Sequence, residues 1–168
     1  MQKYSVILFD LDGTLTDPKE GITKSVQYAL NKMGIEVKNL EELTPFIGPP
    51  LQESFKTHYD MNDQQVHEAL QYYRERFKEK GMFENEVYTG IAELLTALRA
   101  QGLTLAVATS KPTVFAEAIL HHFNLHHFFN CIVGSELDGT RTEKAEVILE
   151  VMKQLHLSSA DGCVMIGD

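Results

Sequence analysis

Positive charge is scarce in this chain. Its 15 Lys and Arg residues stand against 24 Asp and Glu residues, which gives a formal net charge of −9 at pH 7. Nucleic acids and anionic membranes need a basic footprint on their partner, so we expect the chain to bind neither. Any affinity for phosphate must then come from local groups, namely a metal ion, lysines and helix N-termini.

Long apolar runs and cysteines are scarce as well. No run approaches the roughly 20 residues of a membrane span, and no basic segment at the N-terminus leads into an apolar stretch with a cleavage site. The two cysteines, Cys131 and Cys163, lie in separate predicted strands and lack the spacing of a metal site. We therefore predict buried, reduced thiols in a cytoplasmic protein without a signal peptide.

An apolar run at residues 5–9 leads directly into two aspartates. The run predicts a strand buried on both faces, which is typical of a parallel sheet whose ligands lie beyond the carboxyl ends of its strands. Asp10 and Asp12 fall at that end, so both side chains project to the same side while the chain stays extended. Two like charges this close favour a bound cation or one protonated member. A magnesium ion with a phosphoryl ligand meets both needs, and an ordinary acidic turn is the alternative.

A helical region interrupts the alternation of strands and helices. Asp17 and Pro18 predict the start of a helix that Gly34 ends, and a second long helix ends at Gly81. Between them, residues 44–50 contain too many prolines and glycines for a helix interior, and a short helix follows.

The sequence therefore predicts two domains. Residues 1–15 and 83–168 form an α/β core, and residues 16–82 form an all-helical insertion. Within the core, we expect helices and strands to alternate, and this alternation predicts a doubly wound, Rossmann-like parallel sheet with right-handed crossovers. The expected elements after the insertion are helix 90–101, strand 103–108, helix 113–122, strand 131–133, helix 145–155 and strand 163–166.

The segment from Asp10 to Thr14, Asp-Leu-Asp-Gly-Thr, resembles the first motif of the haloacid dehalogenase-like phosphatases. Three later segments are similar to the other motifs of that family and follow in the expected order. They are Thr109-Ser110 after an apolar strand, Lys144 at a helix start, and Val164 to Asp168. The resemblance covers nearly the whole chain. It implies an α/β core with a mobile helical cap hinged over the active site.

The fourth motif departs from the family pattern. In the family it continues with a second acid and further helix and strand, whereas this chain stops at Asp168. We therefore expect that the C-terminal part of the core is missing from this sequence. If the chain does end at Asp168, a catalytically impaired binding module is the alternative.

The resemblance implies a role for each of the three acids. Asp10 is the expected nucleophile, which forms an aspartyl-phosphate. Asp12 is the expected general acid and base, a role that needs a raised pKa. Magnesium would be held by Asp10, by the backbone carbonyl of Asp12 and by Asp168, an all-oxygen ligand set that suits this ion.

Further residues are candidates for binding phosphate. Thr109 and Ser110 precede a helix whose first turn contains Pro112, so hydroxyls and free backbone N–H groups are expected to form an anion site there. Lys144 would neutralise charge on Asp10 and on the phosphoryl oxygens. Lys111 is expected either to assist phosphate binding or to face solvent.

The loop from Phe46 to Pro50 is the candidate for substrate selection. It resembles the cap loop of the phosphoglycolate phosphatase and 5′-nucleotidase-like branch. Phe46 would place an aromatic ring over the substrate, and Gly48 lies in the stiff, proline-flanked turn that would present backbone amides. A plain linker between helices is the alternative.

We therefore predict a magnesium-dependent phosphomonoester hydrolase. Its expected partner is a small soluble phosphate such as phosphoglycolate or a nucleoside monophosphate, and the oligomeric state stays open. A phosphosugar mutase-type phosphotransferase would use the same core residues. A haloacid dehalogenase needs neither Asp12 nor a metal, and a phosphorylated receiver lacks a helical insertion after the first strand.

Overall fold

The structure, a computed structural model, describes residues 3–167 and divides the chain into two compact units. One unit comprises the chain through Asp17 and from Val87 onward, and the other is Pro18–Glu86. The helical unit therefore ends at Glu86, four residues beyond the predicted end at residue 82. The reason is Glu84, whose carbonyl accepts a hydrogen bond from the N–H of Gly21 (2.9 Å) and whose carboxylate forms an ion pair with Arg76 (2.7 Å).

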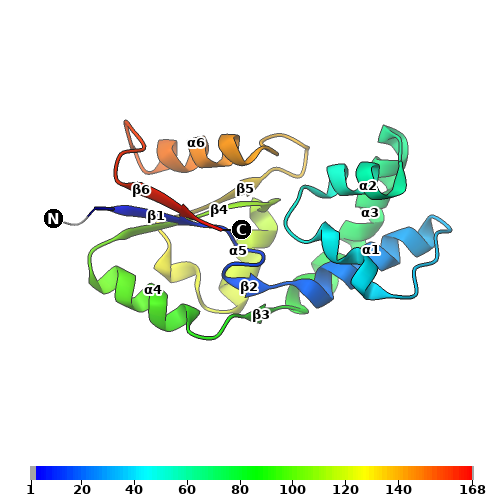
Figure 1. Cartoon of the computed structure of the whole chain (residues 1–168), viewed down its shortest axis with the longest axis horizontal. Helices are drawn as coiled ribbons and strands as arrows, with labels where there is room; N and C mark the ends of the chain where they lie inside the picture. The colour runs from blue at the N-terminus through cyan, green and yellow to red at the C-terminus, as the bar shows by residue number, and fades with distance from the viewer. Residues whose placement is uncertain (1–2, 168) are drawn as a thin grey trace. The chain divides into compact units, whose positions relative to one another are not determined.

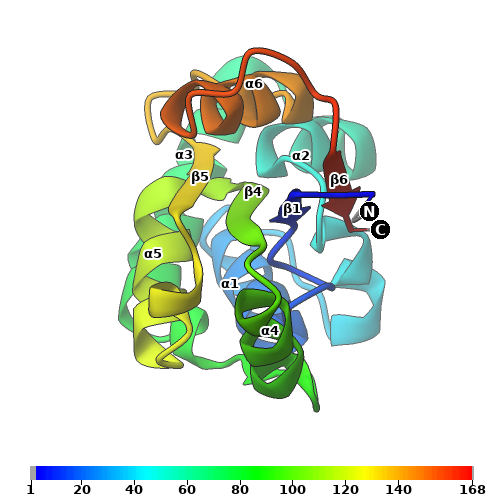
Figure 2. The same cartoon turned by 90° about the vertical axis from the view of Figure 1, so that its left-hand side faces the viewer.

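The first unit is built on a parallel sheet of four strands in the order β5-β4-β1-β6 (Figures 1 and 2). This sheet confirms the predicted α/β class. Every residue of the central strand β1 is buried, as its uninterrupted apolar sequence predicts. The strands are β1 (Val6–Phe9), β4 (Thr104–Pro112), β5 (Cys131–Ser135) and β6 (Cys163–Ile166).

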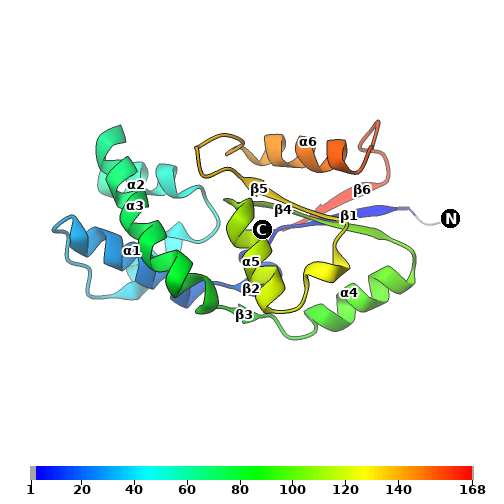
Figure 3. The same cartoon turned by 180° about the vertical axis from the view of Figure 1, so that it is seen from behind.

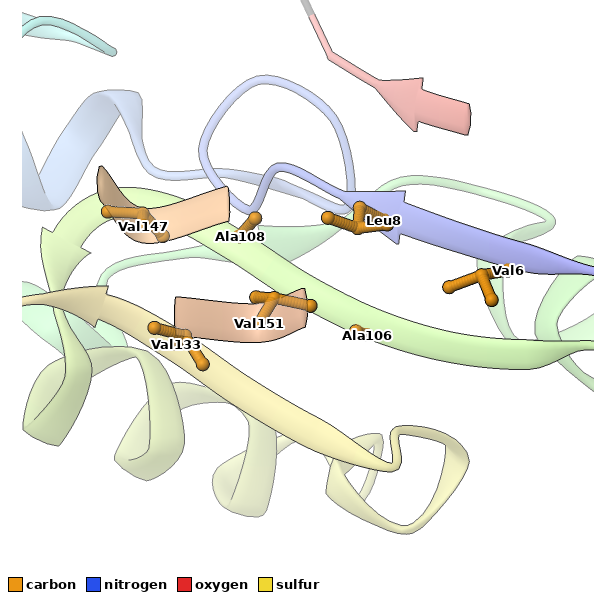
Figure 4. Close-up of a cluster of buried hydrophobic side chains, with 7 residues drawn as sticks. All are labelled: Val6, Leu8, Ala106, Ala108, Val133, Val147 and Val151. Atoms are coloured by element: carbon orange, nitrogen blue, oxygen red, sulfur yellow. The ribbon is translucent and has the colours of Figure 1, made fainter. Parts of the chain in front are cut away.

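Helices cover both faces of this sheet. Helix α6 (Lys144–Gln154) lies on one face, and α4 (Ile91–Ala100) and α5 (Thr113–His122) lie on the other (Figures 1 and 3). Alternate residues of each strand point to the same face. Those on the α6 face pack against Val147 and Val151 of that helix (Figure 4). This cluster comprises Val6, Leu8, Ala106, Ala108, Val133, Val147 and Val151.

Strand β4 is longer than predicted and irregular near its end. Ala108 pairs with Val133 and Pro112 pairs with Ser135, so four steps along β4 match only two along β5. Residues 109–111 therefore form a bulge in the last part of the strand. Thr109 and Ser110, which were expected to follow this strand, are therefore part of it, and α5 begins at Thr113 as expected.

The second unit is helical. Its longest helix, α3, begins with a capping box in which Asn62 and Gln65 satisfy each other's backbone N–H groups. The helices are α1 (Lys19–Lys32), α2 (Leu51–Tyr59) and α3 (Asp63–Glu79), with the 3₁₀ helices η1 (Leu40–Phe46) and η2 (Gly81–Phe83). No helix within residues 3–167 is long and apolar enough to cross a membrane.

Two local predictions for this region are wrong. Asp17 does not cap α1, because it is extended in β2 (Thr16–Asp17), which pairs with β3 (Glu86–Val87). The proline-rich segment is partly helical, since η1 includes Pro45. A short 3₁₀ helix has few internal hydrogen bonds, and the side chain of Asn39 caps this one by accepting from the N–H of Glu41 (3.0 Å).

Candidate active site

Asp10 follows β1 directly and is held by its neighbours on both sides. Its N–H donates to the carbonyl of Ile166 in β6 (2.9 Å), which continues the parallel ladder by one residue. Its Oδ1 accepts from the N–H of Leu11 (2.8 Å), and its Oδ2 accepts from Nζ of Lys144 (2.6 Å). The carboxylate is therefore oriented by one backbone donor and one cation.

Lys144 is the first residue of α6. A capping box between Glu143 and Glu146 defines this helix start, because each side chain satisfies a backbone N–H of the other residue. Besides Asp10, the Nζ of Lys144 donates to the carbonyl of Ala108 in β4 (3.2 Å). The lysine expected from the third motif thus contacts both the carboxylate that follows β1 and the backbone of the neighbouring strand β4.

Asp12 is buried and is paired with Lys111. The Nζ of Lys111 lies 3.0 Å from Oδ2 of Asp12, whereas Oδ1 of Asp12 is buried without a hydrogen-bond partner among the described residues. Burial raises the pKa of Asp12, the charge of Lys111 opposes that increase, and the nearby charge of Asp10 adds to it. A carboxyl group with a raised pKa and one unpaired oxygen is suited to hold and release a proton.

Two lysines offset the repulsion between Asp10 and Asp12. From the sequence, we expected a bound cation or a protonated member to offset the repulsion between Asp10 and Asp12. In the structure each carboxylate has its own lysine, one from the end of β4 and one from the start of α6. Lys111 is buried and therefore does not face solvent.

Thr109 and Ser110 lie in the β4 bulge beside Lys111. Thr109 is buried, and its Oγ1 accepts from the N–H of Lys111 (3.2 Å). Ser110 is partly exposed, and its carbonyl accepts from Oγ of Ser135 (2.9 Å). Thr109 and Ser110 are therefore connected to the acids through Lys111, which follows them in the bulge and pairs with Asp12.

Asp168, the expected third acid, lies outside the described residues. The residue before it, Gly167, lies against Asp10: a Cβ atom on Gly167 would be 3.0 Å from Cβ of Asp10. Sequence reasoning did not single out Gly167, although a glycine beside an expected ligand is the available signal for a close backbone approach. Within residues 3–167 no three His, Cys, Asp or Glu side chains form a metal-binding group.

Phe46 and Gly48 belong to the helical unit. Phe46 is only 2% exposed and packs against Phe55, His58 and Tyr59, with a ring-centroid distance of 5.0 Å to Phe55. The expected role of Phe46 over a substrate is therefore wrong, because this ring is part of the hydrophobic core of its unit. Gly48 has φ of +103°, and a Cβ at this position would have open space around it.

The family is shown by comparison with known proteins. The family model of the haloacid dehalogenase-like hydrolases matches residues 7–168, and the chain belongs to this family. This result confirms the expectation of a haloacid dehalogenase-like phosphatase that the motifs raised.

Individual relatives agree with this assignment. A 5′-nucleotidase of Pseudomonas aeruginosa is 53% identical over 166 residues, which are 99% of this chain and 75% of the relative. The tyrosine-protein kinase PtkA of Mycobacterium tuberculosis is 38% identical over 97% of this chain and 55% of its own length. The crystal structure of a predicted phosphatase from Clostridium acetobutylicum has a TM-score of 0.95 and 53% identity, covering 98% of this chain and 76% of that one.

Proposed function

We propose that this protein is a magnesium-dependent phosphomonoester hydrolase that forms an aspartyl-phosphate on Asp10. The observation that carries the proposal is the pair of carboxylates beyond β1, each paired with a lysine from a different element, Lys111 of β4 and Lys144 of α6. In the first step an oxygen of Asp10 attacks phosphorus, and the bond between phosphorus and the ester oxygen breaks. The backbone N–H of Leu11 and the Nζ of Lys144 orient the attacking carboxylate.

Asp12 supplies the proton that this step needs. Burial makes Asp12 easier to protonate than an exposed aspartate because it raises the pKa, and the protonated carboxyl can donate to the departing ester oxygen and become a carboxylate. In the second step the same carboxylate takes a proton from water, whose oxygen attacks phosphorus and releases Asp10 with inorganic phosphate. The alcohol and phosphate leave, and Asp12 is protonated again.

The cations and hydroxyls hold the phosphoryl group in this proposal. Lys144 and Lys111 bring two positive charges to the site, and Ser110 lies beside Lys111 in the bulge. Positive charge near developing negative oxygens stabilises a phosphoryl-transfer transition state. Lys111 thus has two roles in this proposal, since it pairs with Asp12 and also binds the phosphoryl group.

The residues at the site fit a magnesium ion. Their donor set consists of oxygens only, which this ion prefers, and the main-chain carbonyl of Asp12 accepts no hydrogen bond within residues 3–167. The Asp10 carboxylate and the Asp12 carbonyl would hold the ion, with Asp168 as the third expected ligand. When bound, magnesium supplies positive charge that lets a phosphate dianion approach a carboxylate.

The proposed substrates are small soluble phosphates, with nucleoside monophosphates first. The support is the 53% identity to a protein named as a 5′-nucleotidase. We propose that the helical unit acts as the cap and that the loop at Gly48 contributes to substrate choice. We propose that the protein is cytoplasmic, consistent with the free thiols of Cys131 and Cys163.

Transfer to an acceptor other than water is the second candidate function. The relative named as a tyrosine-protein kinase favours it, and so does the shared chemistry of phosphosugar mutases. Both reactions would use Asp10 and Asp12 in the same roles. They differ only in the group that attacks the aspartyl-phosphate.

A phosphatase assay tests the proposal. The chain is incubated with a panel of nucleoside monophosphates, phosphoglycolate and sugar phosphates, with magnesium, with calcium or with EDTA, and released phosphate is measured. We expect release only with magnesium and weak activity with calcium, which accepts larger and more flexible coordination. Full turnover in EDTA would exclude the metal assignment. Loss of substrate without phosphate release, together with a phosphorylated acceptor, would favour transfer.

A further inference from the structure

We propose that Arg141 is a positioning residue that holds both active-site lysines in place, an inference that rests on the function proposed above. Arg141 lies in the loop between β5 and α6, three residues before Lys144. Its side chain is directed back to β5, on the strand side of the loop. The residue therefore connects the loop before Lys144 to β5, the strand that pairs with the Lys111-bearing strand β4.

The backbone of Arg141 is in an unusual conformation. Of the non-glycine residues with positive φ within residues 3–167, three follow the ordinary pattern of helix ends, since Asp60 is the C-cap of α2, and Asn124 and His156 come directly after the C-caps of α5 and α6. Arg141, with φ of +52°, instead precedes a helix. Arginine adopts this region far less readily than Asn, Asp or His. Such a conformation persists where the surrounding structure holds it, and such positions concentrate at functional sites.

The guanidinium of Arg141 holds the end of β5. Its Nε donates to the carbonyl of Gly134 (2.9 Å), and its Nη2 forms an ion pair and hydrogen bond with Glu136. The planar guanidinium thus binds two successive points of the chain as it leaves the strand. The N–H of Glu136 donates to the carbonyl of Thr140 (3.0 Å), which closes the loop on itself.

The end of β5 in turn holds the β4 bulge. A Cβ atom on Gly134 would lie 2.0 Å from the carbonyl oxygen of Lys111, so the two backbones touch at this point. The N–H of Gly134 donates to Oγ1 of Thr113 (2.9 Å), and Oγ of Ser135 donates to the carbonyl of Ser110 (2.9 Å). These bonds fix the chain on both sides of Lys111, where the regular ladder between the strands is interrupted.

A single arginine therefore acts on both lysines. A shift of the Gly134 carbonyl would move Lys111, whose Nζ lies 3.0 Å from Asp12. A released loop would move the first turn of α6, where Lys144 reaches Asp10. The proposed catalytic groups depend on these distances, and a displacement of about 1 Å can cost on the order of 100-fold in rate.

Arg141→Gly tests this inference, because glycine keeps the loop backbone and removes the side chain. Glycine adopts a positive φ without strain, so the substitution relieves the backbone while it releases Gly134 and Glu136. His156→Gly is the matched control. His156 has φ of +55°, is exposed and lies at the opposite end of α6 from Lys144.

We measure kcat and KM for the preferred phosphate ester, the melting temperature, and the rise in melting temperature that inorganic phosphate with magnesium produces. Arg141→Gly is expected to lower kcat/KM by about 10-fold to 100-fold. It should also abolish the phosphate-induced rise while the melting temperature without phosphate stays near that of the wild type. His156→Gly should keep kcat/KM within about twofold and retain the phosphate-induced rise.

Rescue experiments separate positioning from folding. Low millimolar guanidinium should restore part of the activity of Arg141→Gly, and Arg141→Lys should retain more activity than Arg141→Gly, since lysine keeps the charge but not the planar fork. A loss of activity that follows a loss of melting temperature and resists guanidinium would show a structural role and overturn the inference. So would full activity of Arg141→Gly.

The outcome also distinguishes this inference from the proposed function. A wild-type chain that responds to phosphate but hydrolyses no ester would refute the hydrolase, and a lost phosphate response in Arg141→Gly would still support the positioning role. If the wild-type chain and Arg141→Gly hydrolyse esters at the same rate, the positioning role is refuted and the proposed hydrolase is not. A wild-type chain with neither response would refute both.

Discussion

The Nζ of Lys111 lies 3.0 Å from Oδ2 of Asp12, and the two side chains are only 5% and 9% exposed. Buried pairs of this kind are sensitive to the loss of one member, because the remaining charge keeps its desolvation cost without its partner. The same contact opposes the effect of burial on the pKa of Asp12. This pair thus links the stability of the α/β unit to its proposed proton transfer.

Lys111→Met should therefore destabilise the protein at neutral pH by about 3–5 kcal/mol, with a smaller loss at acid pH where Asp12 can be protonated. Urea unfolding at several pH values measures this difference. Lys153→Met is the control, since the Lys153 side chain is 81% exposed and its ion pair with Glu150 is long (3.9 Å). Equal destabilisation by the two variants would contradict the importance of the buried pair.

Asp12→Asn should change how stability depends on pH. Because burial raises the pKa of Asp12, the folded state binds its proton more tightly than the unfolded chain does. This stabilisation is complete below the ordinary pKa of an aspartate and is lost as the pH rises through the folded value. Asparagine resembles the protonated acid and does not titrate, so the stability of Asp12→Asn relative to the wild type should increase with pH over that interval. Thermal unfolding across a pH series checks this, and the opposite trend would mean that the pKa is lowered.

Asp10 and Asp12 should fail in different ways when substituted. Asp10→Asn removes the attacking carboxylate and should abolish both turnover and the phosphoenzyme. Asp12→Ala keeps the nucleophile but lacks the acid and the base, a loss that typically costs about 10²–10⁴-fold. With an aryl phosphate, whose leaving group needs little acid assistance, Asp12→Ala should accumulate the aspartyl-phosphate.

Mass spectrometry after brief exposure to the aryl phosphate measures this accumulation. The unexposed variants serve as controls for the mass. A phosphorylated Asp10→Asn protein, or normal turnover by Asp12→Ala, would show that the two roles are assigned wrongly.

Phe46→Ala should act mainly on stability. The ring of Phe46 is buried against Phe55, His58 and Tyr59, and truncation of a buried phenylalanine typically costs about 3–5 kcal/mol. Phe46→Leu, which keeps most of the volume, should cost less. Chemical denaturation monitored by circular dichroism compares the two variants. A stable Phe46→Ala protein with a selectively raised KM would restore the substrate-contacting role that the structure argues against.

The part of the site that depends on neighbouring residues could be predicted from the sequence. An apolar strand that ends in Asp10 and Asp12 predicts a buried parallel strand with acids at its carboxyl end, because side-chain hydrophobicity and strand geometry are local properties. The resemblance to the third family motif also placed Lys144 at a helix start, where α6 does begin. Family motifs in order then indicated a phosphatase, and the family match confirms that class.

Only the tertiary structure decided where Lys111 and Phe46 lie. The partner of Lys111 depends on the bulge in β4, which arises from how that strand pairs with β5, and no local pattern in residues 109–112 specifies such a register shift. Phe46 is buried because η1 and α2 pack together, although its Pro- and Gly-rich surroundings are typical of an exposed loop. The sequence by itself determined the acids after β1 and most of the strands and helices, but not β2, β3 or η1. The motif order already indicated that Lys144 meets Asp10, whereas the pairing of Lys111 with Asp12 was decided by contacts between segments far apart along the chain, since such contacts form only when the sheet and its helices assemble.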